Sequence, residues 1–253
     1  MHHDLTDAHH EPLRVTRLVV APHAGDEVLG CGGMLAKHHD DAAVVVLVDP
    51  DEQRLEQLRT ARRMLGSPPV SFLGLPDGQL ADHVERIVSA LSGLIARVRP
   101  AELYLPYPSL HQDHVVAYEA GMRATRSPVR AAWPPVSVLL YEAGGPDVDD
   151  YPADIRWSVG ESLQQEDIDR KVAAALGYRS RLAHTLKERA AGVGSVRGLP
   201  WAEQFALVRA APGGLRRDET VQAVVQAEET VQATVQADET MQVAVPVMAG
   251  GQR

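Results

Sequence analysis

VTRLVVAPHAGDEVLGCGG, residues 15–33, is the stretch from which the fold can first be inferred. Its first part, residues 15–22, is apolar and rich in valine and ends at Ala-Pro, which is typical of a buried strand that runs into a loop. The second part, residues 23–33, contains four glycines. We expect a tight turn there, followed by a short helix over residues 33–40. This order indicates the start of a βα unit.

Apolar runs and amphipathic stripes alternate along the rest of the chain. Continuous apolar runs predict strands that are covered on both faces, and they lie at 42–48, 70–75, 102–108 and 136–142. Helical periodicity predicts helices at 53–66, 82–98, 111–125 and 161–187. A last apolar element lies at 201–210. The alternation predicts an α/β fold, Rossmann-like, with a mainly parallel sheet and helices on both faces.

The composition changes near both ends of the chain. We predict a flexible, histidine-rich N-terminus at 1–14, one α/β domain at 15–211 and a separate tail at 212–253. From Glu219 the tail repeats units such as ETVQAVVQAE every ten residues, with no aromatic residue. This low complexity predicts a disordered tail, and the alternative is a helix or an oligomerising array of strands.

The charge and cysteine content limit the possible functions. Lys and Arg total 25 and Asp and Glu total 34, for a net charge of −9, which disfavours a nucleic-acid partner. Cys31 is the single cysteine and excludes an intramolecular disulfide; we expect it to pack rather than to act as a ligand or nucleophile. We also expect no membrane span or secretory signal, and a cytoplasmic location.

Histidine and aspartate residues follow two of the predicted strands. His23 and Asp26 come after the first strand, and His111, Asp113 and His114 come after the strand at 102–108. The carboxyl ends of parallel strands meet at one edge of a sheet, so these loops can converge. Two imidazoles and one carboxylate can hold a catalytic zinc ion with an open position. The same donors serve non-haem iron, but usually on a double-stranded β-helix, which this chain does not resemble.

The residues after the first strand resemble a known family. APHAGDEVLGCGG, residues 21–33, is similar to the signature loop of the LmbE/PIG-L zinc deacetylases, A/P-H-P-D-D-E-x-x-G-x-G-G. HQDH, residues 111–114, resembles the second motif of that family, H-x-D-H, and the likeness extends over about residues 15–210. It implies a Zn²⁺ cofactor, or another divalent metal, and hydrolysis of N-acyl groups on amino sugars and related metabolites. It also implies a homo-oligomer, a trimer or a hexamer.

The resemblance also implies a role for each site residue. It assigns His23, Asp26 and His114 as metal ligands. It makes His111 a catalytic group for the oxyanion or the leaving amine, and Asp113 a catalytic carboxylate that orients a histidine. Glu27 would be a supporting carboxylate near the loop. Candidate substrate contacts are Tyr107, Ser109 and Trp157, the last in a variable loop at 143–160.

Position 25 departs from the family pattern. The family carries its general base there, as the first Asp of H-P-D-D, and this chain carries Gly25. His111, Asp113 or Glu27 could substitute, the site could bind without turnover, or it could run a different reaction. We expect a metal-dependent hydrolase, an N-deacetylase or amidase with a weakened base. Its substrate would be a small sugar-containing metabolite, in a setting such as secondary metabolism. The alternative is an inactive metal-binding homologue that binds a sugar-like ligand.

Overall fold

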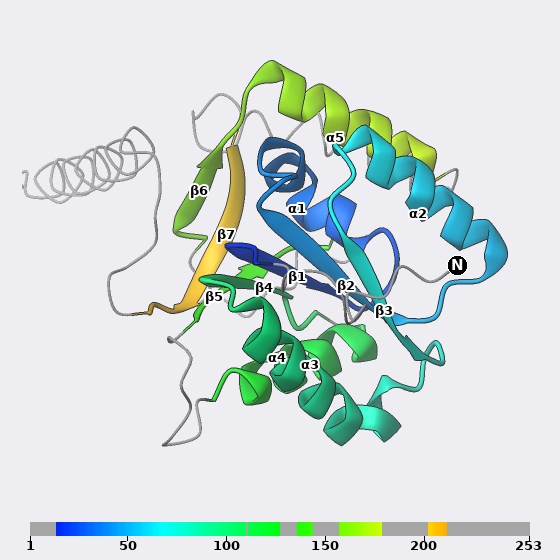
Figure 1. Cartoon of the computed structure of the whole chain (residues 1–253), viewed down its shortest axis with the longest axis vertical. Coiled ribbons are helices and arrows are strands. Elements are labelled where there is room, and N and C mark those ends of the chain that lie inside the picture. The colour runs from blue at the N-terminus through cyan, green and yellow to red at the C-terminus, as the bar shows by residue number, and fades with distance from the viewer. Residues whose placement is uncertain (1–13, 110, 127–135, 144–156, 179–201, 212–253) are drawn as a thin grey trace, which may run out of the picture. The chain divides into compact units, whose positions relative to one another are not determined.

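The computed structural model describes residues 14–109, 111–126, 136–143, 157–178 and 202–211 (Figure 1). Within these residues, seven strands form one mixed sheet in the order β3-β2-β1-β4-β5-β7-β6. Their bounds are β1 Arg17–Ala21, β2 Ala42–Val48, β3 Val70–Leu75, β4 Glu102–Pro106, β5 Ser137–Tyr141, β6 Val159–Ser162 and β7 Ala202–Arg209. Neighbouring strands from β3 to β5 are parallel, whereas β7 runs antiparallel to both β5 and β6.

Helices cover both faces of this sheet. Their bounds are α1 Asp26–Lys37, α2 Glu52–Met64, α3 Val84–Val98, α4 Gln112–Ala124 and α5 Gln165–Gly177, with a 3₁₀ turn, η1, at Leu80–His83. Figure 1 shows α1, α2 and α5 on one side of the sheet and α3 and α4 on the other. The predicted α/β architecture with a mainly parallel sheet is therefore confirmed.

The central strand β1 shows why its sequence is continuously apolar. Leu18 and Val20 belong to the hydrophobic cluster that includes residues of α3 and α4. Val19 and Ala21 belong to the cluster that includes residues of α1, α2 and α5. Successive side chains of a strand point to opposite faces, so a strand buried on both faces needs apolar residues at every position.

The tight turn predicted for the segment 23–33 is present only at residues 24–25, and the predicted helix over 33–40 is wrong, because α1 spans Asp26–Lys37. Gly30, Gly32 and Gly33 are close-packing residues within the helix. A Cβ atom at Gly30 would lie 2.0 Å from Tyr141 Cδ2, and one at Gly33 would lie 2.3 Å from Leu163 Cδ1. Glycine therefore lets the helix approach the sheet and its neighbours, a requirement that local propensity does not reveal.

The predicted helix over 161–187 is wrong at its start. Residues 159–162 form strand β6, and helix α5 runs from Gln165 to Gly177, followed by Tyr178 in a non-helical conformation. The short sequence VGES becomes a strand because it pairs with β7, about forty residues later in the chain. The last apolar element is β7 itself.

Several expectations concern residues outside the described ranges. They include the N-terminus up to residue 13, most of the loop at 143–160 and the whole tail at 212–253. The three-part division of the chain therefore stays a prediction. Among the described helices, none combines the length and the apolar character that crossing a membrane requires.

Candidate metal centre

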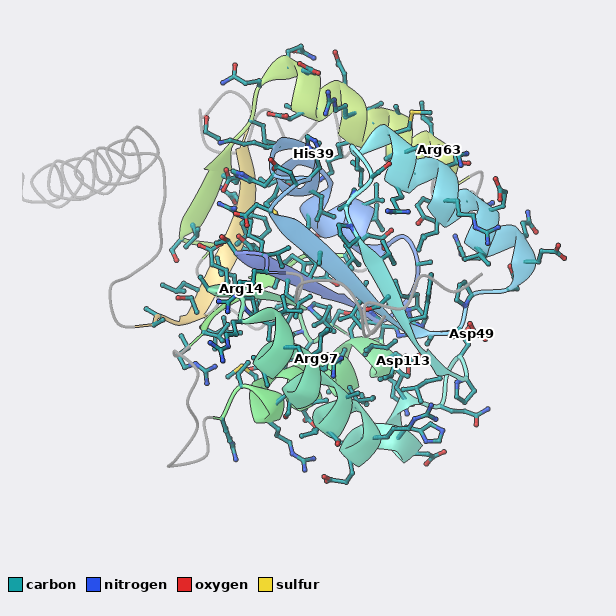
Figure 2. All side chains as sticks on the ribbon, viewed as in Figure 1. Arg14, His39, Asp49, Arg63, Arg97 and Asp113 are labelled. Atoms are coloured by element: carbon teal, nitrogen blue, oxygen red, sulfur yellow. The ribbon has the colours of Figure 1, made fainter. Side chains whose placement is uncertain are left out.

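The candidate site lies beyond the carboxyl ends of β1 and β4. These two strands are parallel neighbours at the sheet centre, where the chain order reverses from β3-β2-β1 to β4-β5. Ligands of open α/β sheets bind at such a reversal, because the connections on its two sides leave in opposite directions. The loop after β1 leads into α1, and the loop after β4 leads into α4. Figure 2 labels Asp49 and Asp113 on one side of the view, away from Arg14, which precedes β1.

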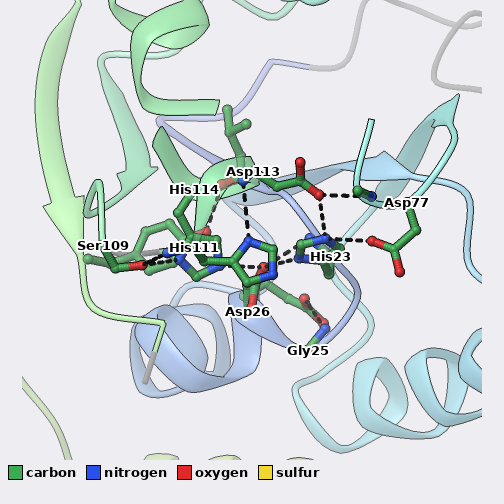
Figure 3. A network of polar contacts seen from close by, with 12 residues as sticks. His23, Gly25, Asp26, Asp77, Ser109, His111, Asp113 and His114 are labelled. Carbon is green, nitrogen blue, oxygen red and sulfur yellow. Dashed lines mark hydrogen bonds and ion pairs between the residues drawn. The ribbon is translucent and has the colours of Figure 1, made fainter. Parts of the chain in front are cut away.

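Three predicted ligands meet at one carboxylate oxygen. Asp26 Oδ2 lies 3.4 Å from His23 Nδ1 and 3.5 Å from His114 Nε2 (Figure 3). The three candidate donor atoms all lie within 4.8 Å of one another. Ligands at 2.0–2.2 Å from a tetrahedral zinc are separated by roughly 3.3–3.5 Å, so the two measured separations suit a shared ion. By its residue types and spacing, this donor set fits Zn²⁺.

The ring of His23 is held on its other side by carboxylates. Its Nε2 lies 3.0 Å from Asp113 Oδ2 and 3.1 Å from Asp77 Oδ1. Asp113 is almost completely buried, and its Oδ2 also accepts a hydrogen bond from Gly78 N–H at 3.2 Å. A carboxylate behind a histidine fixes the ring and leaves the opposite nitrogen free to ligate a metal.

The second loop brings His111 and His114 together. Their rings stack with centroids 4.9 Å apart, and His111 also makes an edge contact with His23 at 5.0 Å. His111 caps α4, because its side chain accepts a hydrogen bond from Asp113 N–H at 3.2 Å. Ser109 Oγ lies 3.0 Å from His114 Nδ1. All five histidine and aspartate residues singled out in the two loops therefore lie in one cluster.

Gly25 occupies a backbone conformation that suits glycine. Its φ is +118°, in the region that side chains of L residues disfavour. Its N–H donates a hydrogen bond to Glu27 Oε2 at 2.7 Å, while Glu27 Oε1 accepts from the Tyr178 hydroxyl at 2.9 Å. Glu27 is buried, and its hydrogen bond with Gly25 stabilises the conformation of the loop.

The neighbouring charges shift the pKa values of these groups. Burial by itself lowers the pKa of His23, but the hydrogen bonds with Asp26 and Asp113 and the charges of Asp26 and Asp77 outweigh it and raise the pKa to about 9. Burial disfavours the charged form of Asp26, but hydrogen bonds from His114 and His23 hold its pKa well below the usual range. Burial raises the pKa of Glu27 to about 7. Burial and the nearby histidines lower the pKa of His111.

A cavity of about 590 Å³ opens beside the cluster. Its wall includes the candidate ligands His23, Asp26 and His114, together with His111 and Gly25. The lining also includes Asp77 and Tyr178, next to the cluster, and the segment after β2 and the start of α2, with Asp49, Pro50, Asp51 and Arg54. The cavity therefore joins the metal-ligand cluster to a polar wall.

Two predicted substrate contacts lie apart from this wall. The rings of Tyr107 and Trp157 are tilted by 51° to each other with centroids 6.0 Å apart, and Tyr107 is buried. Neither residue is among those that line the cavity. Their contact with substrate stays a prediction.

Comparison with known proteins places this cluster in a family. Residues 18–125 match the family model "PIG-L: GlcNAc-PI de-N-acetylase". The uncharacterized deacetylase YaiS of Escherichia coli (strain K12) is 28% identical over 178 residues, covering 64% of this chain and 90% of YaiS. This chain has a domain of the PIG-L deacetylase family.

Solved structures agree with the assignment to the PIG-L fold. The conserved protein TT1542 from Thermus thermophilus is 26% identical with a TM-score of 0.62, covering 81% of this chain and 98% of TT1542. An N,N'-diacetylchitobiose deacetylase from Pyrococcus horikoshii is 16% identical with a TM-score of 0.56, covering 76% of this chain and 83% of that protein. The PIG-L match includes both loops of the cluster.

Sequence reasoning missed several residues of this candidate site. Asp77 contacts His23, Gly78 donates to Asp113, and Asp49 and Arg54 line the cavity. These residues follow β2 and β3, whose carboxyl ends lie at the same edge as that of β1. Polar residues that follow the carboxyl end of a parallel strand led to His23 and His111. The same criterion would have led to GLPDG at 74–78 and to the residues after 48. Cys31 is fully buried, in keeping with the packing role expected for it.

Proposed function

We propose that this chain is a metal-dependent hydrolase that removes an acyl group, most simply acetyl, from the amine of a sugar-containing small metabolite. The observation that carries the proposal is the arrangement of His23, Asp26 and His114 around one carboxylate oxygen beside a cavity. Membership of the PIG-L deacetylase family supports the reaction class. The name of the chitobiose deacetylase supports an amino-sugar substrate by analogy of fold.

The proposed ligands are His23, Asp26 and His114, and the proposed cofactor is Zn²⁺. A bound zinc would polarise the acyl oxygen and lower the pKa of a water molecule to ~7. Asp113 orients His23 through the ring nitrogen that faces away from Asp26. The ring of His114 is turned in the same way, with one nitrogen toward Asp26 and the other toward Ser109.

His111 is the proposed proton donor. Its Nδ1 accepts the Asp113 N–H, so a neutral ring carries its proton on Nε2. Its lowered pKa keeps the ring neutral near pH 7, and the residue lines the cavity. An Nε2–H group in that place can stabilise a developing oxyanion or protonate the leaving amine.

The proton acceptor is the weak point of the site. Both oxygens of Glu27 accept hydrogen bonds, and Glu27 is not among the residues that line the cavity. Asp113 is buried and engaged with His23. His111 can accept a proton only by giving up its bond from Asp113 N–H. We therefore propose slow hydrolysis, since a general base typically contributes about 10²–10⁴-fold.

The part of the cavity lining that Asp49 and Arg54 form suits a hydroxylated substrate. Arg54, whose guanidinium lies over the Tyr178 ring at 5.6 Å, offers N–H donors, and Asp49 offers a carboxylate acceptor. Sugar hydroxyls can accept hydrogen bonds from Arg54 and donate them to Asp49. This wall supports a small-molecule, amino-sugar substrate rather than a simple acylated amine.

Acetate release from N-acetylglucosamine and from N,N'-diacetylchitobiose by the zinc-loaded protein tests the proposal. We expect His23→Ala and His114→Ala to abolish both zinc binding and acetate release. His83→Ala is the matched control, because His83 is outside the cluster at the start of α3. Equal acetate release by the wild type and both ligand variants would refute metal-dependent hydrolysis.

Gly25 favours one second candidate, a non-catalytic PIG-L homologue that binds metal and a sugar-like ligand. Its support is that glycine offers no proton acceptor at the place of the family's base. Tight binding of zinc and glucosamine without any acetate release, over hours and at high protein concentration, would favour this candidate.

A further inference from the structure

We infer that Ser109 positions His114 as a metal ligand, an inference that rests on the proposed function. The sequence suggested a substrate contact for this serine, but its hydroxyl lies behind a ligand ring. Ser109 Oγ is 3.0 Å from His114 Nδ1, and Nε2 of the same ring is 3.5 Å from Asp26 Oδ2 (Figure 3). The ring thus lies between a hydroxyl and the carboxylate of the metal cluster.

The hydroxyl can accept the N–H of the tautomer that ligation requires. A neutral imidazole has one N–H and one lone pair, so His114 can ligate through Nε2 only while Nδ1 holds the proton. A serine oxygen can accept two hydrogen bonds. Ser109 Oγ accepts one from the His111 backbone N–H at 3.3 Å. Its second acceptor position is then available for His114 Nδ1–H.

The serine is itself held in place by the backbone. Its N–H donates to the Tyr107 carbonyl at 2.8 Å, which forms a tight turn three residues after β4 ends at Pro106. The His114 N–H in turn donates to the His111 carbonyl at 3.0 Å. One hydroxyl therefore links the loop, the first turn of α4 and a ligand ring, and His114 has little freedom to rotate.

The two candidate ligand histidines are supported by different groups. His23 is backed by the carboxylate of Asp113, whereas His114 is backed by a neutral hydroxyl. Partners of this kind fix the orientation of metal-bound histidines, and their loss typically lowers metal affinity about 10–100-fold. Ser109 is therefore a positioning residue, and its removal should weaken zinc binding by a similar factor.

The experiment measures zinc affinity of the full-length chain by competition with a chelating dye. We expect Ser109→Ala to raise the Kd for Zn²⁺ by about 10–100-fold, and Ser109→Thr, which keeps the hydroxyl, to restore most of the affinity. Ser92→Ala is the matched control, because Ser92 lies on α3 and its Oγ donates to the Ala124 carbonyl at 3.4 Å, away from the metal cluster. Circular dichroism checks that each variant is folded.

Nitrogen-15 NMR of the zinc-loaded protein adds a direct readout. The wild type should show a slowly exchanging proton on His114 Nδ1, and Ser109→Ala should exchange it faster.

The outcomes separate this inference from the proposed function. Unchanged zinc affinity in Ser109→Ala, with a raised KM for N-acetylglucosamine, would overturn the inference in favour of a substrate contact and leave the proposed function intact. Loss of stability without loss of zinc affinity would overturn it in favour of a purely structural role. Failure of the wild type to bind zinc would overturn both.

Discussion

Replacing Gly25 with Asp returns a carboxylate to the place where the PIG-L family carries its general base. We expect the Gly25→Asp variant to hydrolyse N-acetylglucosamine faster than the wild type and to be less stable. Space is available, because a Cβ atom at this position would lie 3.7 Å from the nearest atom, Tyr178 Cε1. The cost comes from the backbone, which holds Gly25 at φ +118°.

Both effects can be given a size. A non-glycine residue in a sparsely populated backbone conformation costs about 1–3 kcal/mol. For a domain of this length, each kcal/mol lowers the Tm by about 2–4 °C, so we expect a loss of about 2–12 °C. A well-placed base is worth about 10²–10⁴-fold, and the strained backbone will place it imperfectly. We therefore expect a gain of at least about tenfold.

The matched control is Gly25→Asn. It has nearly the same shape and the same backbone cost, but its amide cannot accept the proton. The assay compares acetate release by the wild type and the two variants at equal zinc content, with Tm values from circular dichroism. Because both variants carry the same backbone strain, the ratio of their rates measures the effect of the carboxylate alone.

Equal rates for Gly25→Asp and Gly25→Asn, with both folded and zinc-loaded, would refute the reasoning that a missing base at position 25 limits the reaction. Unchanged Tm values in both variants would instead contradict the argument from backbone strain.

Three further predictions concern a buried ion pair of the fold and two groups of the site. In Glu203→Ala, the buried ammonium of Lys171, now 2.7 Å from Glu203, loses its partner, so urea unfolding should show a loss of about 3–5 kcal/mol; less than about 1 kcal/mol would contradict this. Because the folded pKa of His23 is raised to about 9, its stabilising effect is present below pH 6.5 and is lost as the pH rises to 9. The Tm of the protein freed of metal with a chelator should fall between pH 6.5 and 9. In Asp26→Asn the Tm should decrease less over the same pH interval. Asp113→Ala removes the partner of His23 and should weaken zinc binding about 10–100-fold, measured by dye competition.

Much of the architecture could be predicted from local patterns. The strands at 42–48 and 70–75 match β2 and β3 at both ends. β2 is buried along its whole length, as a continuously apolar run predicts, whereas β3 lies at the edge of the sheet and is only partly buried. The helix predicted over 53–66 corresponds to α2 at Glu52–Met64, and Gly66 follows it with φ +90°. The start of α1 could not be predicted, because its glycines are required by close packing against Tyr141 and Leu163, which lie far along the chain.

The two site loops could be predicted because each follows a recognisable strand and carries residue types that bind metals. Their contact depends on β1 pairing with β4 rather than with another strand, and the same pairing brings Asp26 beside His114. Local periodicity records which residues are buried, and so the amino-acid order alone was enough for the α/β class and the donor types. The amino-acid order does not predict which side chain contacts each histidine ring. The structure shows these partners, which are Asp113 for His23 and Ser109 for His114. Those contacts depend on loop conformation and on distances between segments that no pattern in one segment encodes.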